Sequence, residues 1–249
     1  MLHKVVAEPG KEPRDWAVVA FADPGEGSEE VVNFFFSELP EIVDATLIFG
    51  HQRKELKDAF GTILIEGLLP AFEHLKRIRA SVGVDIPILN RSQHFEDFAG
   101  RLWHAYKDLW PQAIATMGYN IGFAFQEDGK FETGWNVFQN EHQNIPTALG
   151  DFLRKQRSDW QCELAAFRND YLEHRKPEVA NFEKLYEPKT AEFLFERGWK
   201  SIAEVSVLFL SRHLPASTRL EVIPPQEQNP MRQRRFRFAV ARGVRFVRP

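Results

Sequence analysis

Apolar residues recur every three or four positions along four long stretches of the chain, which is the spacing that places side chains on one face of an α-helix. The stretches cover about 42–80, 94–118, from Thr147 to about 176, and 189–213. Pro70 is expected to kink or split the first helix, and Pro111 to bend the second. A shorter helix is expected to begin at Ser28 and to stop near Pro40. This pattern predicts an all-α fold, a bundle of four main helices.

Two segments near the C-terminus alternate between apolar and polar residues instead. They cover 220–223 and 235–240, with proline-containing turns between them, so a short β-hairpin or extended arm is expected there. The aromatic stretch 123–138 is ambiguous, because Asp128-Gly129 suits either a hairpin turn or a loop. The predicted domains are an N-terminal extension over 1–41 packed on the bundle, the helical bundle over 42–215, and a basic C-terminal hairpin or arm over 216–249.

Composition narrows the class of protein. The chain has 249 residues, 43% of them hydrophobic, and its 22 Phe and six Trp predict an aromatic core. The single cysteine, Cys162, excludes an internal disulfide and a Cys-rich zinc site, and it is expected to be buried. No apolar run is long enough to cross a bilayer and the first residues do not resemble a signal peptide. We therefore expect a soluble cytoplasmic protein that does not act at a membrane.

The common signatures of metal and cofactor sites are missing from the sequence. There is no His-Glu-x-x-His, no paired Glu-x-x-His, no P-loop and no Gly-x-Gly-x-x-Gly. His94, Glu96, Asp97 and His104 lie close together in sequence, but on a helix they would spread over both sides and are expected to be solvated. No metal ion and no cofactor is therefore predicted.

Charge is distributed unevenly. Seven of the 32 Lys and Arg residues lie in 231–249, which has no acid, leaving 25 bases against 35 acids elsewhere. In a strand Arg235 and Arg237 would share one face, with Phe236 and Phe238 on the other. The arginines, with Arg234, would then follow a nucleic-acid backbone and bind substrate. Alternatively, the tail packs on its own acidic body or on an acidic protein partner.

A candidate catalytic group lies at the expected end of the third helix. Arg168-Asn169 is followed after four residues by His174, and then by Arg175 and Lys176 before Pro177. The residue before a proline is biased away from the α conformation, so the helix is expected to stop here. A guanidinium group can bind phosphate through two hydrogen bonds, and an imidazole can transfer a proton near neutral pH.

This arrangement resembles the Arg-x4–6-His signature of the HEPN superfamily, small helical domains that include metal-independent endoribonucleases. The resemblance implies RNA cleavage through 2′-hydroxyl attack, with Arg168, Asn169 and His174 as catalytic residues and Arg175 and Lys176 contacting substrate. It also implies a homodimer with the site at the interface, and by analogy a role in defence or toxin systems, where an antitoxin would be a partner. The alternatives are a non-catalytic HEPN-like module that binds nucleic acid or protein, and a plain helix end where basic residues suit the helix dipole.

Helix geometry limits how the pair can act. Arg168 and His174 lie six positions apart, so on a straight helix they would point about 120° away from each other. They can face one phosphate only if the helix breaks between them or if a second copy of the chain completes the site.

Overall fold

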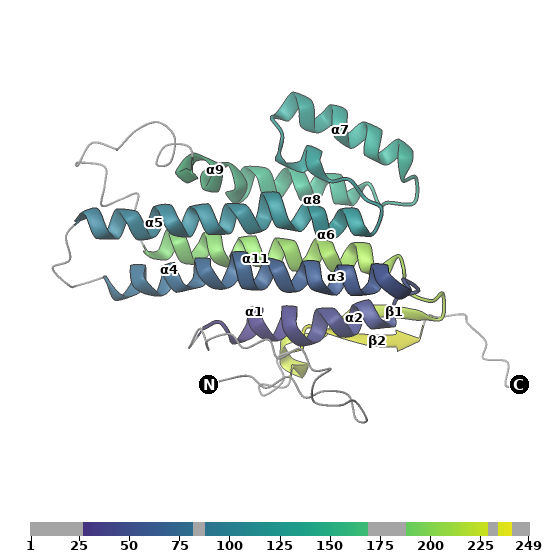
Figure 1. The fold of residues 1–249 in the computed structure, drawn as a ribbon. Helices are drawn as coiled ribbons and strands as arrows, with labels where there is room; N and C mark the ends of the chain where they lie inside the picture. Colours follow the sequence, from purple (N-terminus) through teal and green to yellow (C-terminus); the bar gives the residue numbers. More distant parts are fainter. Residues whose placement is uncertain (1–26, 82–87, 169–187, 229–233, 241–249) are drawn as a thin grey trace, which may run out of the picture.

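The computed structural model describes residues 27–81, 88–168, 188–228 and 234–240, which form a mostly helical bundle with a small two-stranded antiparallel sheet (Figure 1). The predicted bundle of helices is confirmed at this level. Among the described residues, no helix carries an apolar stretch of the length that a membrane crossing needs.

Most of the long helical rods combine two α-helices joined without a break by a π-helical turn. The rods are α1 (Glu29–Asn33), η2 (Phe34–Glu38) and α2 (Leu39–Ala45); α3 (Gly50–Thr62), η3 (Ile63–Leu68) and α4 (Leu69–Ala80); α5 (Ile88–Trp103), η4 (His104–Leu109) and α6 (Trp110–Thr116); and α8 (Ala148–Gln156), η6 (Arg157–Gln161) and α9 (Cys162–Arg168). A single unbroken helix, α11 (Pro188–Ser211), packs against α2, α4, α5 and α6.

Three of these π-turns end two residues before a proline. The residue preceding each proline donates its backbone N–H to the carbonyl five positions earlier: Leu39 to Phe34, Leu69 to Leu64, and Trp110 to Ala105. A proline has no N–H to donate and its ring clashes with the carbonyl four positions back, so a wider turn lets the helix continue. The short helix predicted to begin at Ser28 and to stop near Pro40 therefore continues past this proline and ends at Ala45. At Pro70, expected to kink or split its helix, and at Pro111, expected to bend its helix, the chain continues from a π-turn into a further α-helix.

The wide turns also explain the spacing of the buried side chains. In each of these three rods the core residues recur every four positions: 31, 35, 39 and 43; 56, 60, 64, 68 and 72; and 98, 102, 106, 110 and 114. On a pure α-helix each step of four drifts by about 40° around the axis. The extra residue in each π-turn reverses much of this drift and returns the stripe to the core.

The rods cross most closely where two π-turns meet. A Cβ atom added to Gly67 in η3 would lie 2.4 Å from the Cβ of Ala105 in η4 and 3.0 Å from its Cα. Glycine is thus required at 67 because the partner's backbone occupies the space that a side chain would need. Both residues are fully buried or nearly so.

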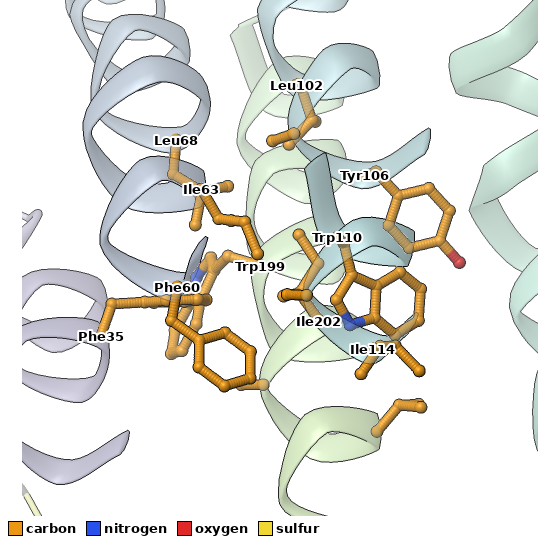
Figure 2. Packing of buried hydrophobic residues seen from close by; sticks show 14 of the residues in the cluster. Phe35, Phe60, Ile63, Leu68, Leu102, Tyr106, Trp110, Ile114, Trp199 and Ile202 are labelled. Carbon is orange, nitrogen blue, oxygen red and sulfur yellow. The ribbon is translucent and has the colours of Figure 1, made fainter. Parts of the chain in front are cut away.

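Aromatic side chains fill the space around this crossing, as the composition predicted. Figure 2 shows Phe35, Phe60 and Trp199 on one side of the cluster and Tyr106 and Trp110 on the other. Trp110 is fully buried and donates its indole N–H to the Ser206 hydroxyl of α11 at 3.1 Å. The Tyr106 ring lies 4.7 Å from that of Trp160, which brings the α8–α9 rod into the same core.

The ambiguous stretch after α6 is neither hairpin nor loop. It forms a 3-10 turn, η5 (Gly122–Phe125), and then α7 (Asp128–Glu141). Phe131, Trp135 and Phe138 are buried on one face of α7, at helical spacing. Asp128 in the first turn suits the positive end of the helix dipole. Aromatic residues that would flank a hairpin turn instead form a helical stripe.

The C-terminal hairpin is present as predicted. β1 (Thr218–Val222) pairs antiparallel with β2 (Phe236–Val240), with Leu220 opposite Phe238, and a 3-10 turn, η9 (Pro225–Glu227), follows β1. Phe236 packs on the core, 6.2 Å from the Phe34 ring, whereas Phe238 is 43% exposed. The predicted boundary between residues 41 and 42 lies inside α2, and the α1–α2 rod contributes to the same core as the other helices.

The Gly67 crossing yields a stability prediction. Gly67→Ala is expected to lower the free energy of unfolding by about 1–3 kcal/mol, because the new methyl group overpacks against Ala105. The matched control is Gly61→Ala in α3, where a Cβ meets nothing within 4 Å. That change should stabilise the protein by about 0.5–1 kcal/mol, the usual gain when alanine replaces glycine in a helix. Urea denaturation measures both, and equal effects of the two changes would contradict the crossing.

Candidate functional site

The predicted catalytic segment begins where α9 ends. Arg168 is the last residue of α9 and is partly exposed. Its neighbour Phe167 is buried and stacks on Phe95 of α5, with ring centroids 6.4 Å apart. The other four predicted residues, Asn169, His174, Arg175 and Lys176, lie outside the described residues. The structure therefore places Arg168 at one end of the bundle and leaves its relation to His174 as a prediction.

The same end of the bundle brings together two histidines and an aspartate. α4 ends and α5 begins at this end, at the left of Figure 1, and the two helices pack side by side. His74 belongs to α4, whereas His94 and Asp97 lie one turn apart on α5. Each offers one ligand atom, and these three atoms lie within 4.8 Å of one another. On α5 alone His94 and Asp97 are expected to be solvated; the third member of the cluster, His74, comes from another helix, which no local pattern indicates.

Burial and hydrogen bonding define the state of this cluster. Nδ1 of His74 lies 3.7 Å from Oδ2 of Asp97, too far for a hydrogen bond, and Gln93 donates to Oδ1 of the same carboxylate at 3.1 Å. Nδ1 of His74 and Nδ1 of His94 are both buried without a hydrogen-bond partner among the described residues. Burial lowers the pKa of His74, with Asp97 opposing this shift. A neutral imidazole with an unused ring nitrogen can accept a proton or bind a metal ion.

A second polar feature lies at the opposite end of the bundle. A hollow of about 450 Å³ is lined by Tyr119, Ile145, Arg212 and residues 140–144. The ring of Tyr119 lies edge-on to His142, at 5.0 Å between centroids, and to His213, at 5.8 Å. Burial raises the pKa of Tyr119 and lowers that of His213. No local sequence pattern indicates this group, because its members come from the ends of three different helices.

The three arginines of the C-terminal arm that are predicted to bind substrate, Arg234, Arg235 and Arg237, contact the chain's own acids. Arg234 pairs with Glu41 at 2.6 Å, and Arg237 pairs with Glu227 at 2.7 Å. The Arg235 guanidinium lies over the Trp199 ring, 5.1 Å from its centroid, with Glu204 at 3.7 Å. These contacts agree with the alternative interpretation of the basic tail, in which the tail packs on the acidic body of the same chain.

A buried carboxylate attaches this arm to the bundle. Glu38 is only 3% exposed, and its oxygens accept the backbone N–H groups of Arg235, at 2.9 and 3.1 Å, and Phe236, at 2.5 Å. Burial raises the pKa of Glu38, and the two backbone N–H groups oppose the shift. Glu38 therefore replaces, for the start of β2, hydrogen-bond partners that a neighbouring strand would otherwise supply.

Cys162 is exposed at the start of α9, not buried as predicted, because it lies two residues from both Trp160 and Leu164 and therefore on the opposite face of the helix. Comparison with protein-family models, with curated proteins and with solved structures finds no significant match to this chain.

Replacement of Glu38 tests the attachment of the arm. Glu38→Ala removes the acceptor of two partly buried N–H groups and is expected to destabilise the protein by roughly 1–3 kcal/mol for each group left unpaired. Glu38→Gln retains one carbonyl oxygen in place and is expected to cost much less. Because the folded pKa is raised, titration of Glu38 favours folding below its ordinary value of 4.5 and ceases to do so as pH rises through the folded pKa. Denaturation at pH 4 and pH 7 should therefore show Glu38→Gln improving relative to wild type at the higher pH.

His213 yields a pH prediction of the opposite sign. Burial and the Arg212 charge lower the pKa of His213 below the ordinary 6.5. Just below pH 6.5 the unfolded chain therefore binds a proton at this imidazole more readily than the folded chain does. This contribution to stability is present above pH 6.5 and is lost as pH falls from that value toward the folded pKa. Urea denaturation should show a smaller loss of stability between pH 7.5 and pH 5.5 for His213→Gln than for wild type. His51→Gln, at an exposed site, should behave as wild type, and equal losses in all three proteins would contradict the prediction.

Proposed function

We propose that this protein is a metal-independent endoribonuclease of the HEPN type, with its catalytic site at the end of the bundle where α9 terminates. The observation that carries the proposal is the position of Arg168. The third helix delivers this guanidinium to the bundle end, partly exposed, with the backbone fixed by the Phe167–Phe95 stack just before it. Asn169 and His174 follow directly in sequence.

Each residue has a distinct role in the proposed reaction. Neutral His174 accepts the proton of the 2′-hydroxyl as that oxygen attacks the adjacent phosphorus, and Arg168 stabilises the negative charge that builds on the phosphoryl oxygens. Asn169 orients the phosphate or His174, while Arg175 and Lys176 bind neighbouring phosphates. The bond to the 5′-oxygen breaks, giving a 2′,3′-cyclic phosphate and a 5′-hydroxyl.

The bundle end carries positive charge beside the proposed catalytic residues. Arg77 and Arg101 are close enough to influence the His74 imidazole electrostatically, so their positive charge adds to that of Arg168 at this end. We therefore place the main RNA contacts at the bundle end, beside the proposed catalytic residues, and propose that a homodimer completes the site.

The proposal predicts the behaviour of two variants. Arg168→Ala and His174→Ala should each reduce cleavage by about 100-fold or more, the usual contribution of such groups, while the unfolding temperature stays near that of wild type. The assay uses labelled RNA in the presence of a chelator, with the ends of the products mapped. His104→Ala is the control, because this exposed histidine pairs with Asp108 on its own helix at 2.9 Å. RNA binding without cleavage by wild type would favour the non-catalytic alternative.

Mixing the two inactive variants tests the composite site. If Arg168 of one protomer acts with His174 of the other, random mixed dimers regain one intact site in half of the dimers, or about a quarter of wild-type activity. If both residues act within one protomer, the mixture stays inactive. Cleavage that persists in each single variant would instead remove the assignment altogether.

A further inference from the structure

We propose that His74, His94 and Asp97 form a binding site for a divalent transition metal of the zinc class. Two imidazole nitrogens and one carboxylate oxygen are ligands that Zn²⁺ uses, with one position left for water or an anion. Mg²⁺ and Ca²⁺ prefer sites made of oxygen ligands alone. The donor set therefore favours zinc or a similar late transition metal.

The three ligand atoms lie near the distances that an ion needs. In a tetrahedral site with bonds of about 2.0–2.2 Å, two ligand atoms of one zinc ion lie about 3.3–3.6 Å apart. The three candidate atoms are within 4.8 Å of one another, and Nδ1 of His74 is 3.7 Å from Oδ2 of Asp97, so side-chain shifts of up to about 1 Å close the site. His94 and Asp97 share one face of α5 because they are three residues apart, and His74 faces them from α4.

The surroundings of the cluster also fit a ligand. Gln93 holds Oδ1 of Asp97 at 3.1 Å, which leaves Oδ2 directed toward His74. Hydrogen bonds of this kind orient the ligands of metal sites. The buried Nδ1 atoms of His74 and His94 have no hydrogen-bond partner among the described residues, and an unpaired buried polar atom costs free energy. A metal ion bound by these nitrogens would remove that cost.

Charge near the cluster limits what else binds there. Asp97 contributes one negative charge, whereas Arg77 and Arg101 act on His74 with positive charge. A bare divalent cation would leave the cluster positively charged, so an anionic ligand such as hydroxide fits the fourth position. The ion would link α4 to α5 beside the α5–α9 contact, and we expect it to stabilise this end of the bundle.

The test is zinc binding by the purified, chelator-stripped full chain. Titration with ZnCl₂ against a colorimetric chelator should give one tightly bound ion per chain, and the unfolding temperature should rise with zinc. His94→Gln and Asp97→Asn should each weaken binding by about 10-fold or more and remove the temperature shift. Asp97→Asn keeps the size of the side chain, and circular dichroism of each stripped variant checks that it is folded.

The matched control is the double variant His104→Gln/Asp108→Asn. It removes a histidine and an aspartate that lie 2.9 Å apart on the η4 turn but do not belong to the cluster. This variant should bind zinc as wild type does. Equal loss in the control and the cluster variants, no binding by wild type, or stronger response to MgCl₂ than to ZnCl₂ would each overturn the proposal.

The metal site and the ribonuclease proposal fail separately. Cleavage that persists in chelator, with zinc binding lost in the cluster variants, supports both. Cleavage that disappears with zinc removal overturns the metal-independent mechanism but leaves the metal site standing. Zinc binding with no cleavage by any preparation likewise removes the enzyme and retains the ion.

Discussion

The close approach of Gly67 to Ala105 sets the arrangement of the bundle. Both residues lie in π-turns that precede prolines, and the two backbones meet with no room for a side chain at 67. A crossing this tight fixes α4 against α5 immediately beyond it. The position of α5 in turn fixes α9 through the Phe95–Phe167 stack. The candidate metal ligands and Arg168 are therefore positioned by one backbone contact several residues away from any of them.

The π-turns decide which side chains point where. Each inserts one residue relative to an α-helix, and so rotates everything that follows by about 100°. His74 comes four residues after Pro70, beyond η3, so this inserted residue helps to direct it toward α5 and the partners His94 and Asp97. A straight α-helix of the same sequence would direct His74 elsewhere. The prolines thus influence chemistry at the bundle end, although none of them lies in the cluster.

Much of the architecture could be predicted from the sequence, because periodic apolar residues record which face of a helix is buried. The rods around Phe60, Tyr106 and Trp199 and the hairpin at Leu220 follow directly from that signal. The π-turns were missed, although steps of four such as 56, 60, 64, 68 and 72 contain their signature. α7 was missed because Asp128-Gly129 fits a turn as well as a helix start. Local patterns do not distinguish these cases; packing against the rest of the core does.

The candidate sites are harder to predict from the sequence than the fold, because their residues meet only when separate helices pack together. Arg168 and His174 are close in sequence, so a motif can suggest them, but their meeting depends on residues outside the described parts of the chain. His74 lies twenty residues before His94, and no spacing rule joins them until α4 and α5 pack together. Glu38 binds Arg235 and Phe236 from almost the other end of the chain. Because that carboxylate holds the basic arm on the acidic body, arginines that the sequence pattern offers to a phosphate backbone contact acids of the same chain instead.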